Sequence, residues 1–279
     1  MIIDIHTHIF PADIRQNRDQ FFPAEPAFQL LYQSPKSKLI GATELLSAMD
    51  EHRVDKSVIF GFPWSHSDTY RFHNDYVMAS VQKYPDRFIG LGCFDPADAQ
   101  APAETERCLA GGLSGIGELA FYGSGIDQLA LEQLDPIMNL CHQSDLPVLI
   151  HTNEPVGHHY HGKTPITLGQ IYGLIERFPD NKLILAHWGG GLFFYSLMKK
   201  QVKERLKNVY FDTAASPFLY DASVYRIASE LIGADKILFG TDFPLLPPAR
   251  YFSDMDAAGL TPAEVDQVCG LNAKRLFAC

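Results

Sequence analysis

Ile2-Ile3-Asp4-Ile5-His6-Thr7-His8 opens the chain with an apolar run that ends in two histidines. The run predicts a buried strand. Residues two apart on a strand share a face, so His6 and His8 point the same way and can bind one metal ion. Two histidines on one strand face have few structural uses. The stretch therefore predicts a strand whose carboxyl end carries metal chemistry.

Seven more apolar runs follow, and segments with helical spacing alternate with them. Continuous apolar strands that alternate with helices indicate a parallel sheet covered on its outer face. Eight such units in 279 residues fit a closed (β/α)8 TIM barrel that forms a single domain over residues 1–279. The later runs cover residues 58–60, 88–93, 113–118, 148–150, 183–186, 209–211 and 237–239. The helical segments cover residues 44–49, 74–83, 103–110, 131–143, 166–177, 191–206 and 222–232, and a last helix begins at Thr261.

A doubly wound open sheet is the structural alternative to the barrel. No Gly-x-Gly-x-x-Gly motif follows the first run, which disfavours a dinucleotide-binding fold of that kind. One long irregular stretch, residues 10–41, follows the first run and is rich in proline and aromatic residues. Loops of that size in a compact domain are usually functional, so we expect a lid or a subunit interface there.

The composition is that of an ordinary globular protein, with 46% hydrophobic and 20% charged residues. The formal charge, 23 minus 33 or −10, disfavours binding to nucleic acid or to an anionic membrane. No apolar run approaches the roughly 18 residues of a membrane span, and no secretory signal is visible. The five cysteines show no paired spacing and read as reduced thiols. We therefore expect a cytoplasmic protein that acts on a small molecule.

Ligand-type side chains stand where several of the predicted strands end. Barrel enzymes place their active sites at the carboxyl ends of the strands, so these side chains should converge. Imidazole and carboxylate groups suit zinc and other divalent metals, and such a metal lowers the pKa of bound water from about 15.7 towards about 7. Asp242 could hold the metal and take the proton of the water, and His187 could bind a second metal or polarise a carbonyl. The set comprises His6, His8, Glu118, His151, His187 and Asp242.

The order of a histidine pair, mid-chain histidines and a late aspartate resembles the amidohydrolase superfamily. The strings at residues 185–191 (Leu-Ala-His-Trp-Gly-Gly-Gly) and 239–244 (Phe-Gly-Thr-Asp-Phe-Pro) are similar to its "amidohydrolase 2" branch. The resemblance covers essentially the whole chain. It implies a (β/α)8 barrel, and it also suggests a homodimer. The residues that it implies are His6, His8, His151 and Asp242 on the metal, with His187 as a ligand or catalytic group.

That branch contains hydrolases, lactonases and non-oxidative decarboxylases, so the resemblance does not settle the reaction. Many of its decarboxylases resemble His-x-Gly-Glu after the sixth strand, and here Gly190 stands in place of the glutamate. The string Gly-Ile-Gly-Glu that ends at Glu118 is similar to the fourth-strand motif of TatD-type hydrolases, in which a glutamate joins two metals. Alternatively, Glu118 orients a histidine without touching the metal.

The loop after the fifth run concentrates polar and cationic residues. Within it, His158, His161 and Lys163 are expected to contact an anionic or carbonyl-bearing substrate, although a solvated loop is the alternative. Trp64 after the second run and Phe243 after the eighth are expected to form an apolar wall. Aromatic residues near a strand end serve equally often in packing.

Taken together, these features predict a metal-dependent hydrolase. Hydroxide on one or two ions, zinc ahead of manganese, is expected to attack an amide, ester or lactone of a small molecule. His187 would stabilise the oxyanion and Asp242 would pass the proton to the leaving group. One alternative is a non-oxidative decarboxylase of a small aromatic acid. The second alternative, suggested by Glu118, is a phosphodiesterase.

Overall fold

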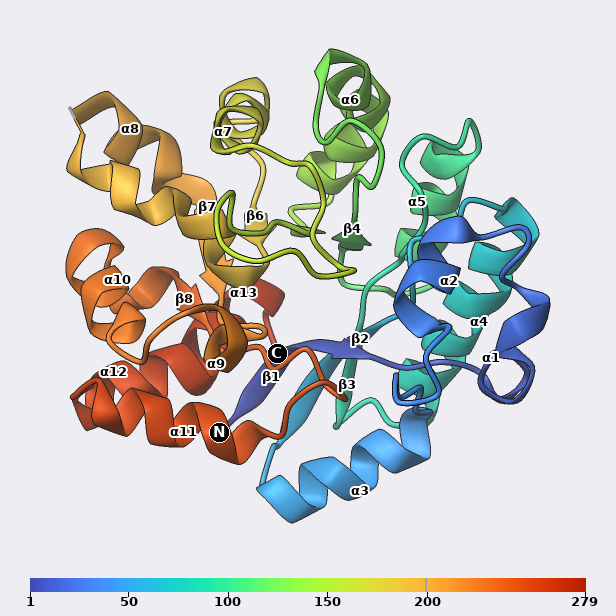
Figure 1. Ribbon diagram of the computed structural model, residues 1–279, viewed down its shortest axis with the longest axis horizontal. Coiled ribbons are helices and arrows are strands. Elements are labelled where there is room, and N and C mark those ends of the chain that lie inside the picture. The colour runs from blue at the N-terminus through green and yellow to red at the C-terminus, as the bar shows by residue number, and fades with distance from the viewer. Residues whose placement is uncertain (199) are drawn as a thin grey trace.

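The computed structural model describes residues 1–198 and 200–279, in which eight parallel strands are surrounded by helices (Figure 1). Each apolar run predicted from the sequence overlaps one of these strands. Hydrogen bonds join β1, β2 and β3 into one sheet and β4 to β8 into another, always in sequence order. The strands are β1 (Ile3–His8), β2 (Lys56–Phe60), β3 (Phe88–Gly90), β4 (Ile116–Leu119), β5 (Val148–Ile150), β6 (Leu183–Leu185), β7 (Val209–Asp212) and β8 (Ile237–Leu238).

Backbone contacts close both seams between the two sheets. The Ile5 N–H donates to the carbonyl of Phe239 at 2.8 Å, which joins β1 to the end of β8. The Gly117 N–H donates to the carbonyl of Gly92 at 2.8 Å, which joins β4 to the segment after β3. The eight strands therefore form a closed (β/α)8 barrel, as predicted, and the open sheet is excluded.

Alternating strand residues fill the inside of the barrel. Buried side chains such as Ile3, Val58 and Leu149 form one cluster, to which α13 (Asn272–Phe277) adds Phe277. Full burial of one such side chain contributes roughly 1.5–3 kcal/mol to the free energy of unfolding. This packed interior and the helix beneath it confine open space to the other end, where the strands finish.

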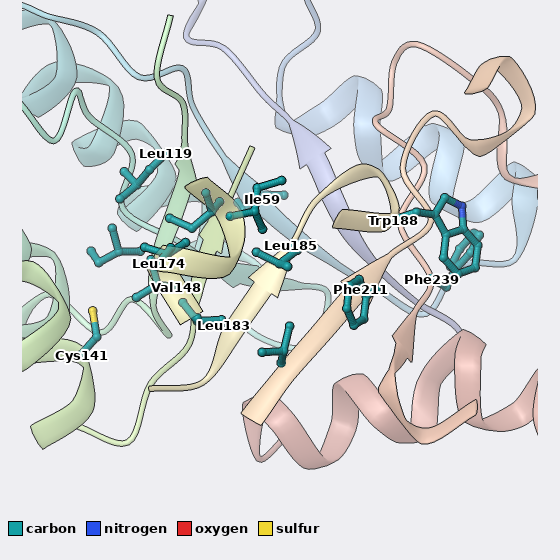
Figure 2. Close-up of a cluster of buried hydrophobic side chains, with 14 of the residues drawn as sticks. Ile59, Leu119, Cys141, Val148, Leu174, Leu183, Leu185, Trp188, Phe211 and Phe239 are labelled. Atoms are coloured by element: carbon teal, nitrogen blue, oxygen red, sulfur yellow. The ribbon is translucent and has the colours of Figure 1, made fainter. Parts of the chain in front are cut away.

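The outward-facing strand residues pack under the surrounding helices. Figure 2 shows Val148 and Leu183 beside Leu174 of α7 (Leu168–Arg177) and Cys141 of α6 (Gln128–Gln143). Because side chains on a strand alternate between faces, burial on both faces explains why the runs read as continuously apolar.

Most predicted helices are present with ends shifted by a few residues, although the helix predicted over residues 74–83 begins at Ser67. One prediction is wrong: residues 191–206 do not form a single helix. The backbone is left-handed from Trp188 to Gly191, where φ lies between 60° and 88°, so these residues interrupt the 3-10 turns of His187–Leu197, which precede α8 (Lys200–Arg205). The other helices are α3 (Ala42–His52), α4 (Ser67–Lys83), α5 (Ala101–Ala110), α9 (Ser216–Leu219), α10 (Val224–Ile232), α11 (Pro248–Ala257) and α12 (Pro262–Asp266). Within the described ranges, none of the helices has the length and apolar character needed to span a membrane.

Residues 10–41 are not irregular, which corrects the sequence interpretation. They contain α1 (Ala12–Gln16), the 3-10 turn Arg18–Gln20 and α2 (Pro26–Tyr32). Phe28 of α2 is fully buried and lies 4.4 Å from Trp64 between ring centroids. The segment is therefore part of the core, because its aromatic residues pack against the loop after β2. Its role as a lid or an interface stays a prediction.

Candidate active site

β1 presents two histidines to the open end of the barrel. The register of β1 against β2 shifts between Asp4 and Thr7. Such a bulge re-aims the side chains that follow it. Ile5 fills the barrel interior, and both His6 and His8 nevertheless turn into the same open space. The expectation that the two imidazoles share a face therefore agrees with the structure.

Glu118, at the end of β4, lies among four histidines. Its Oε2 is 3.5 Å from Nε2 of His6 and 3.8 Å from Nε2 of His8. Its Oε1 is 2.9 Å from Nδ1 of His151 and 3.6 Å from Nε2 of His187. One carboxylate from β4 thus touches side chains from β1 and from the ends of β5 and β6.

Asp242 completes the group from the end of β8. Its Oδ1 lies 3.4 Å from Nε2 of His8 and 3.8 Å from Nε2 of His6. Asp242 and His187 both adopt left-handed backbone, with φ of 60° and 54°. Such a conformation costs roughly 1–2 kcal/mol for a residue with a Cβ and is typical of functional sites. We call the six converging residues the floor: His6, His8, Glu118, His151, His187 and Asp242.

The floor has the chemistry of a metal site. Three overlapping groups of its side chains each bring three ligand atoms within 4.8 Å of one another. The Nε2 of His6 is buried and has no hydrogen-bond partner among the described residues. A buried nitrogen without a partner is costly unless something binds it. The groups are His6, His8 and Glu118; His6, His187 and Asp242; and Glu118, His151 and His187.

Hydrogen bonds fix the orientation of the floor histidines. Nδ1 of His6 donates to Oδ2 of Asp212 at 2.9 Å. Nδ1 of His8 donates to the carbonyl of Gly61 at 3.0 Å, and Nδ1 of His187 donates to the carbonyl of Ala214 at 3.0 Å. Each contact leaves Nε2 facing the cavity, as a partner outside the metal shell does in metalloenzymes.

Asp212 is a functional residue that the sequence interpretation missed. It is fully buried at the end of β7, and its Oδ1 accepts the N–H groups of His187 at 2.8 Å and Ala214 at 3.0 Å. A signal was present, because Asp212 directly follows the seventh apolar run, as the floor residues follow theirs.

The floor residues are strongly coupled electrostatically. Burial alone would raise the pKa of Glu118, but the charges of His6 and His151 hold it well below its usual range. Burial would lower the pKa of His187, but the Glu118 hydrogen bond and the Asp242 charge raise it to about 9. Burial opposes the charge on Asp242, and the hydrogen bond from His8 lowers the pKa of Asp242 nevertheless. The site therefore stabilises carboxylates beside cationic groups. A bound divalent ion would supply the positive charge in place of those cationic groups.

A cavity of about 670 Å³ opens above the floor. It is larger than a single aromatic ring requires and falls in the range of ordinary ligand sites. Aromatic side chains from five different segments line its sides. We call these residues the wall: Tyr32, Phe62, Tyr122, Tyr160 and Phe218.

Only one of the residues expected to bind substrate reaches this cavity. His158 lines it, whereas His161 and Lys163 do not. The Lys163 ammonium donates to Glu154 at 2.9 Å and to the carbonyl of Val156 at 2.7 Å. Lys163 therefore ties its own loop together, which explains why this cation is not offered to a ligand.

The two expected wall residues are also placed elsewhere. Trp64 is 0% exposed, and its indole N–H donates to Nδ1 of His73 at 2.8 Å. Phe243 is half-buried, its backbone pairs with Thr7 of β1, and its side chain does not line the cavity. The expectation for Trp64 and Phe243 is corrected because core packing, not the cavity, takes their rings. No sequence pattern marked Tyr32 or Tyr122, which line the cavity instead.

The family comparison covers nearly the whole chain. A family model described as Amidohydrolase matches residues 3–278. Gamma-resorcylate decarboxylase of Polaromonas sp. is 23% identical over 286 residues, which cover 82% of this chain and 85% of that protein. 2-Amino-3-carboxymuconate-6-semialdehyde decarboxylase of Dictyostelium discoideum is 23% identical over 300 residues, which cover 87% of this chain and 81% of that protein.

Solved structures share the fold. 5-Carboxyvanillate decarboxylase from Sphingomonas paucimobilis has a TM-score of 0.76 at 20% identity and covers 99% of this chain and 98% of its own. Dihydroxybenzoic acid decarboxylase from Polaromonas sp., with bound manganese and the inhibitor 2-nitroresorcinol, has a TM-score of 0.72 at 20% identity and covers 99% of this chain and 96% of its own. At these identities the likeness supports the barrel.

These relatives contradict the expectation of hydrolysis. The sequence interpretation placed amide, ester or lactone hydrolysis first and decarboxylation second, whereas the relatives named above are decarboxylases. They give the phosphodiesterase alternative no support either. A glycine at position 190, which counts mildly against decarboxylation in the sequence interpretation, does not exclude this reaction, since the reaction class does not follow from one loop residue.

Proposed function

We propose that this chain, which belongs to the amidohydrolase family, is a metal-dependent enzyme that decarboxylates a small aromatic acid without oxidation. The observation that carries the proposal is an aromatic wall directly above a floor of metal-ligand side chains. The decarboxylase relatives, which match 82% and 87% of the chain, support the same reaction.

We assign the metal to His6, His8, His151 and Asp242, with Glu118 as a further ligand. The buried, unpartnered Nε2 of His6 supports this assignment, because it needs a partner inside the cavity. Bound there, a divalent ion would hold the substrate carboxylate and an adjacent hydroxyl oxygen and offset their charge. Manganese is proposed ahead of zinc, because imidazole and carboxylate ligands suit both and a structural neighbour contains manganese.

The reaction requires one bond to break and one proton to arrive. The bond between the ring carbon and the carboxyl carbon breaks, its electron pair stays on the ring carbon, and CO2 leaves. The same ring carbon takes up one proton. We assign the proton transfer to Nε2 of His187, which lines the cavity while Nδ1 donates to Ala214. Water then returns a proton to His187.

Gly190 is compatible with this role. A Cβ at position 190 would collide with the backbone carbonyl of Asn153, so this loop leaves no room for a glutamate. The carbonyl of Ala214 instead fixes the His187 ring, through the 3.0 Å hydrogen bond from Nδ1. The orientation of the His187 ring therefore does not require a carboxylate at position 190.

The test is product analysis with carboxyl-labelled acids. Manganese-loaded protein is incubated with ¹³C-carboxyl 2,6-dihydroxybenzoate and 5-carboxyvanillate, and ¹³CO2 and the ring product are measured. The proposal predicts equal amounts of both products, lost on chelation and in His187→Asn. The control His142→Asn changes an exposed histidine and should keep the activity. Turnover that is unchanged in His187→Asn would contradict the assigned proton donor, and absence of ¹³CO2 across a panel of hydroxybenzoates would contradict the reaction.

A further inference from the structure

Two phenol hydroxyls of the wall have no hydrogen-bond partner among the residues that the structure describes. Tyr32, at the end of α2, and Tyr122, three residues after β4, both line the cavity and are half-buried. In the part of the chain that the structure describes, neither hydroxyl makes a hydrogen bond. The third tyrosine of the wall differs, because the Tyr160 hydroxyl donates to Glu154 at 2.9 Å.

Packing fixes the rings that carry these two hydroxyls. Phe62 touches both, with centroid distances of 6.1 Å to Tyr32 and 6.4 Å to Tyr122, and it is stacked on Tyr122 at an interplanar angle of 23°. Tyr32 also packs on Phe28 at 4.9 Å and on Phe10 at 5.4 Å. Aromatic contacts of this kind hold each ring in place. The hydroxyls are therefore preset groups of the cavity and not loose side chains.

Their surroundings keep both hydroxyls protonated. Burial raises the pKa of Tyr32, and the carboxylates of Asp242 and Glu118 raise it further. Burial likewise raises the pKa of Tyr122, with Glu118 again adding to the effect. At neutral pH each phenol is thus a hydrogen-bond donor close to the floor.

A bound aromatic ring changes whether these two hydroxyls have a hydrogen-bond partner. Water can solvate them in the open cavity, but a ring that packs beside Tyr32, Phe62 and Tyr122 displaces the water next to the two hydroxyls. A buried hydroxyl left without a partner weakens binding by about tenfold or more. Sites built with such donors therefore reject ligands that lack the matching oxygen.

We propose that Tyr32 and Tyr122 are specificity-determining residues that donate hydrogen bonds to an oxygen on the substrate ring. This inference rests on the proposed function, in which the carboxylate and its adjacent hydroxyl occupy the floor. The substrate class is then an aromatic acid with at least one further ring oxygen, placed toward the side of the cavity formed by Tyr32, Phe62 and Tyr122. A simple 2-hydroxybenzoate would satisfy the floor but not the two phenols.

Calorimetric titration of the manganese-loaded protein tests this without turnover. The probes are 2-hydroxybenzoate and the four dihydroxybenzoates that keep its hydroxyl (2,3-, 2,4-, 2,5- and 2,6-). At least one dihydroxybenzoate should bind about tenfold tighter than 2-hydroxybenzoate. Tyr32→Phe and Tyr122→Phe should each reduce that preference to about threefold or less, and the Kd of 2-hydroxybenzoate should fall by about threefold or more, because this probe no longer leaves a phenol unpaired.

Tyr220→Phe is the matched control. Tyr220 is half-buried and lines a neighbouring cavity of about 670 Å³, so the preference should persist in this variant. Equal binding of all five probes by wild type, or an unchanged preference in both Phe variants, would overturn the proposal. Binding and turnover separate the two claims. A tyrosine-dependent preference without ¹³CO2 release would contradict only the reaction, and release without tyrosine dependence would contradict only this inference.

Discussion

The floor and the wall of the cavity are built by different parts of the fold. Each floor residue lies on a strand or within four residues of its end, so the hydrogen-bonded register of the barrel sets its position. The wall residues come from loops and short helices that follow the strands, and packing of aromatic rings sets the positions of Tyr32, Phe62 and Tyr122. The difference teaches that this fold can keep one set of metal-ligand side chains while its loops vary, and under our proposal the wall decides which acid is accepted.

The largest effect is expected at the floor. Asp242→Asn removes a carboxylate that lies 3.4 Å from His8 Nε2, and with it a proposed metal ligand. We expect kcat to fall by at least about 1,000-fold, because both metal affinity and charge in the site are lost. Metal content per chain is measured together with activity. Asp256→Asn, an exposed position on α11, is the control and should behave as wild type.

The stability of the packing behind the wall should depend on pH, because this packing contains the buried His73. Nε2 of His73 donates to the Ile9 carbonyl at 2.6 Å, its Nδ1 accepts from Trp64, and burial lowers its pKa to about 4. An unfolded histidine titrates near pH 6.5, so the unfolded chain binds more protons between these values. The contribution of neutral His73 to the free energy of unfolding should therefore be complete above about pH 6.5. About 3 kcal/mol should be lost as the pH falls to about 4.

Urea unfolding of metal-free protein between pH 7 and about pH 4 measures this loss. The variant His73→Gln should lose the share of the pH dependence that belongs to this histidine, whereas the exposed His142→Gln should keep it. Identical pH slopes for wild type and His73→Gln would show that the wall does not depend on a neutral His73.

A smaller effect is expected just outside the floor. Asp212→Asn keeps the shape of the carboxylate that holds His6 at 2.9 Å but removes its charge. Orienting partners of metal-bound histidines are worth about 10- to 100-fold in metal affinity. A competition titration with a chelator measures the change. The exposed Asp235→Asn is the control, and an unchanged affinity in Asp212→Asn would contradict the orienting role.

The smallest effect is expected in the loop that carries His158. Lys163→Met breaks the 2.9 Å ion pair with Glu154 and frees the loop, so KM should rise by about three- to tenfold with kcat unchanged. Lys182→Met breaks a 2.8 Å pair with Asp145 on an exposed surface and should leave both constants unchanged. A rise in KM that grows with the negative charge of the substrate would instead indicate that Lys163 contacts the substrate directly.

The contrast also explains what the sequence could predict. His6 and His8 were found because strand parity places them together, and Glu118 and Asp242 because they follow apolar runs. Asp212 obeyed the same rule and was overlooked. The floor is therefore predictable in principle, since barrel geometry converts a linear order of strand ends into a cluster.

The wall had no comparable rule. Phe62 and Trp64 stand two residues apart, yet Phe62 lines the cavity while Trp64 is buried against His73. The choice depends on α2, which packs Phe28 against both rings and belongs to a segment without helical periodicity in the sequence. Tyr32 reaches the cavity through the same packing. Long-range contacts of this kind leave no local pattern. For the same reason, the local sequence at Gly190 does not predict the reaction class.

Anomalous diffraction at the manganese edge, from crystals of manganese-loaded protein, tests the central claim most directly. The account predicts a peak about 2.0–2.3 Å from Nε2 of His6 and of His8, and in contact with Asp242. The peak should be lost in Asp242→Asn. A peak elsewhere, or no peak in crystals of protein that retains activity, would contradict the assignment of the floor as the metal site.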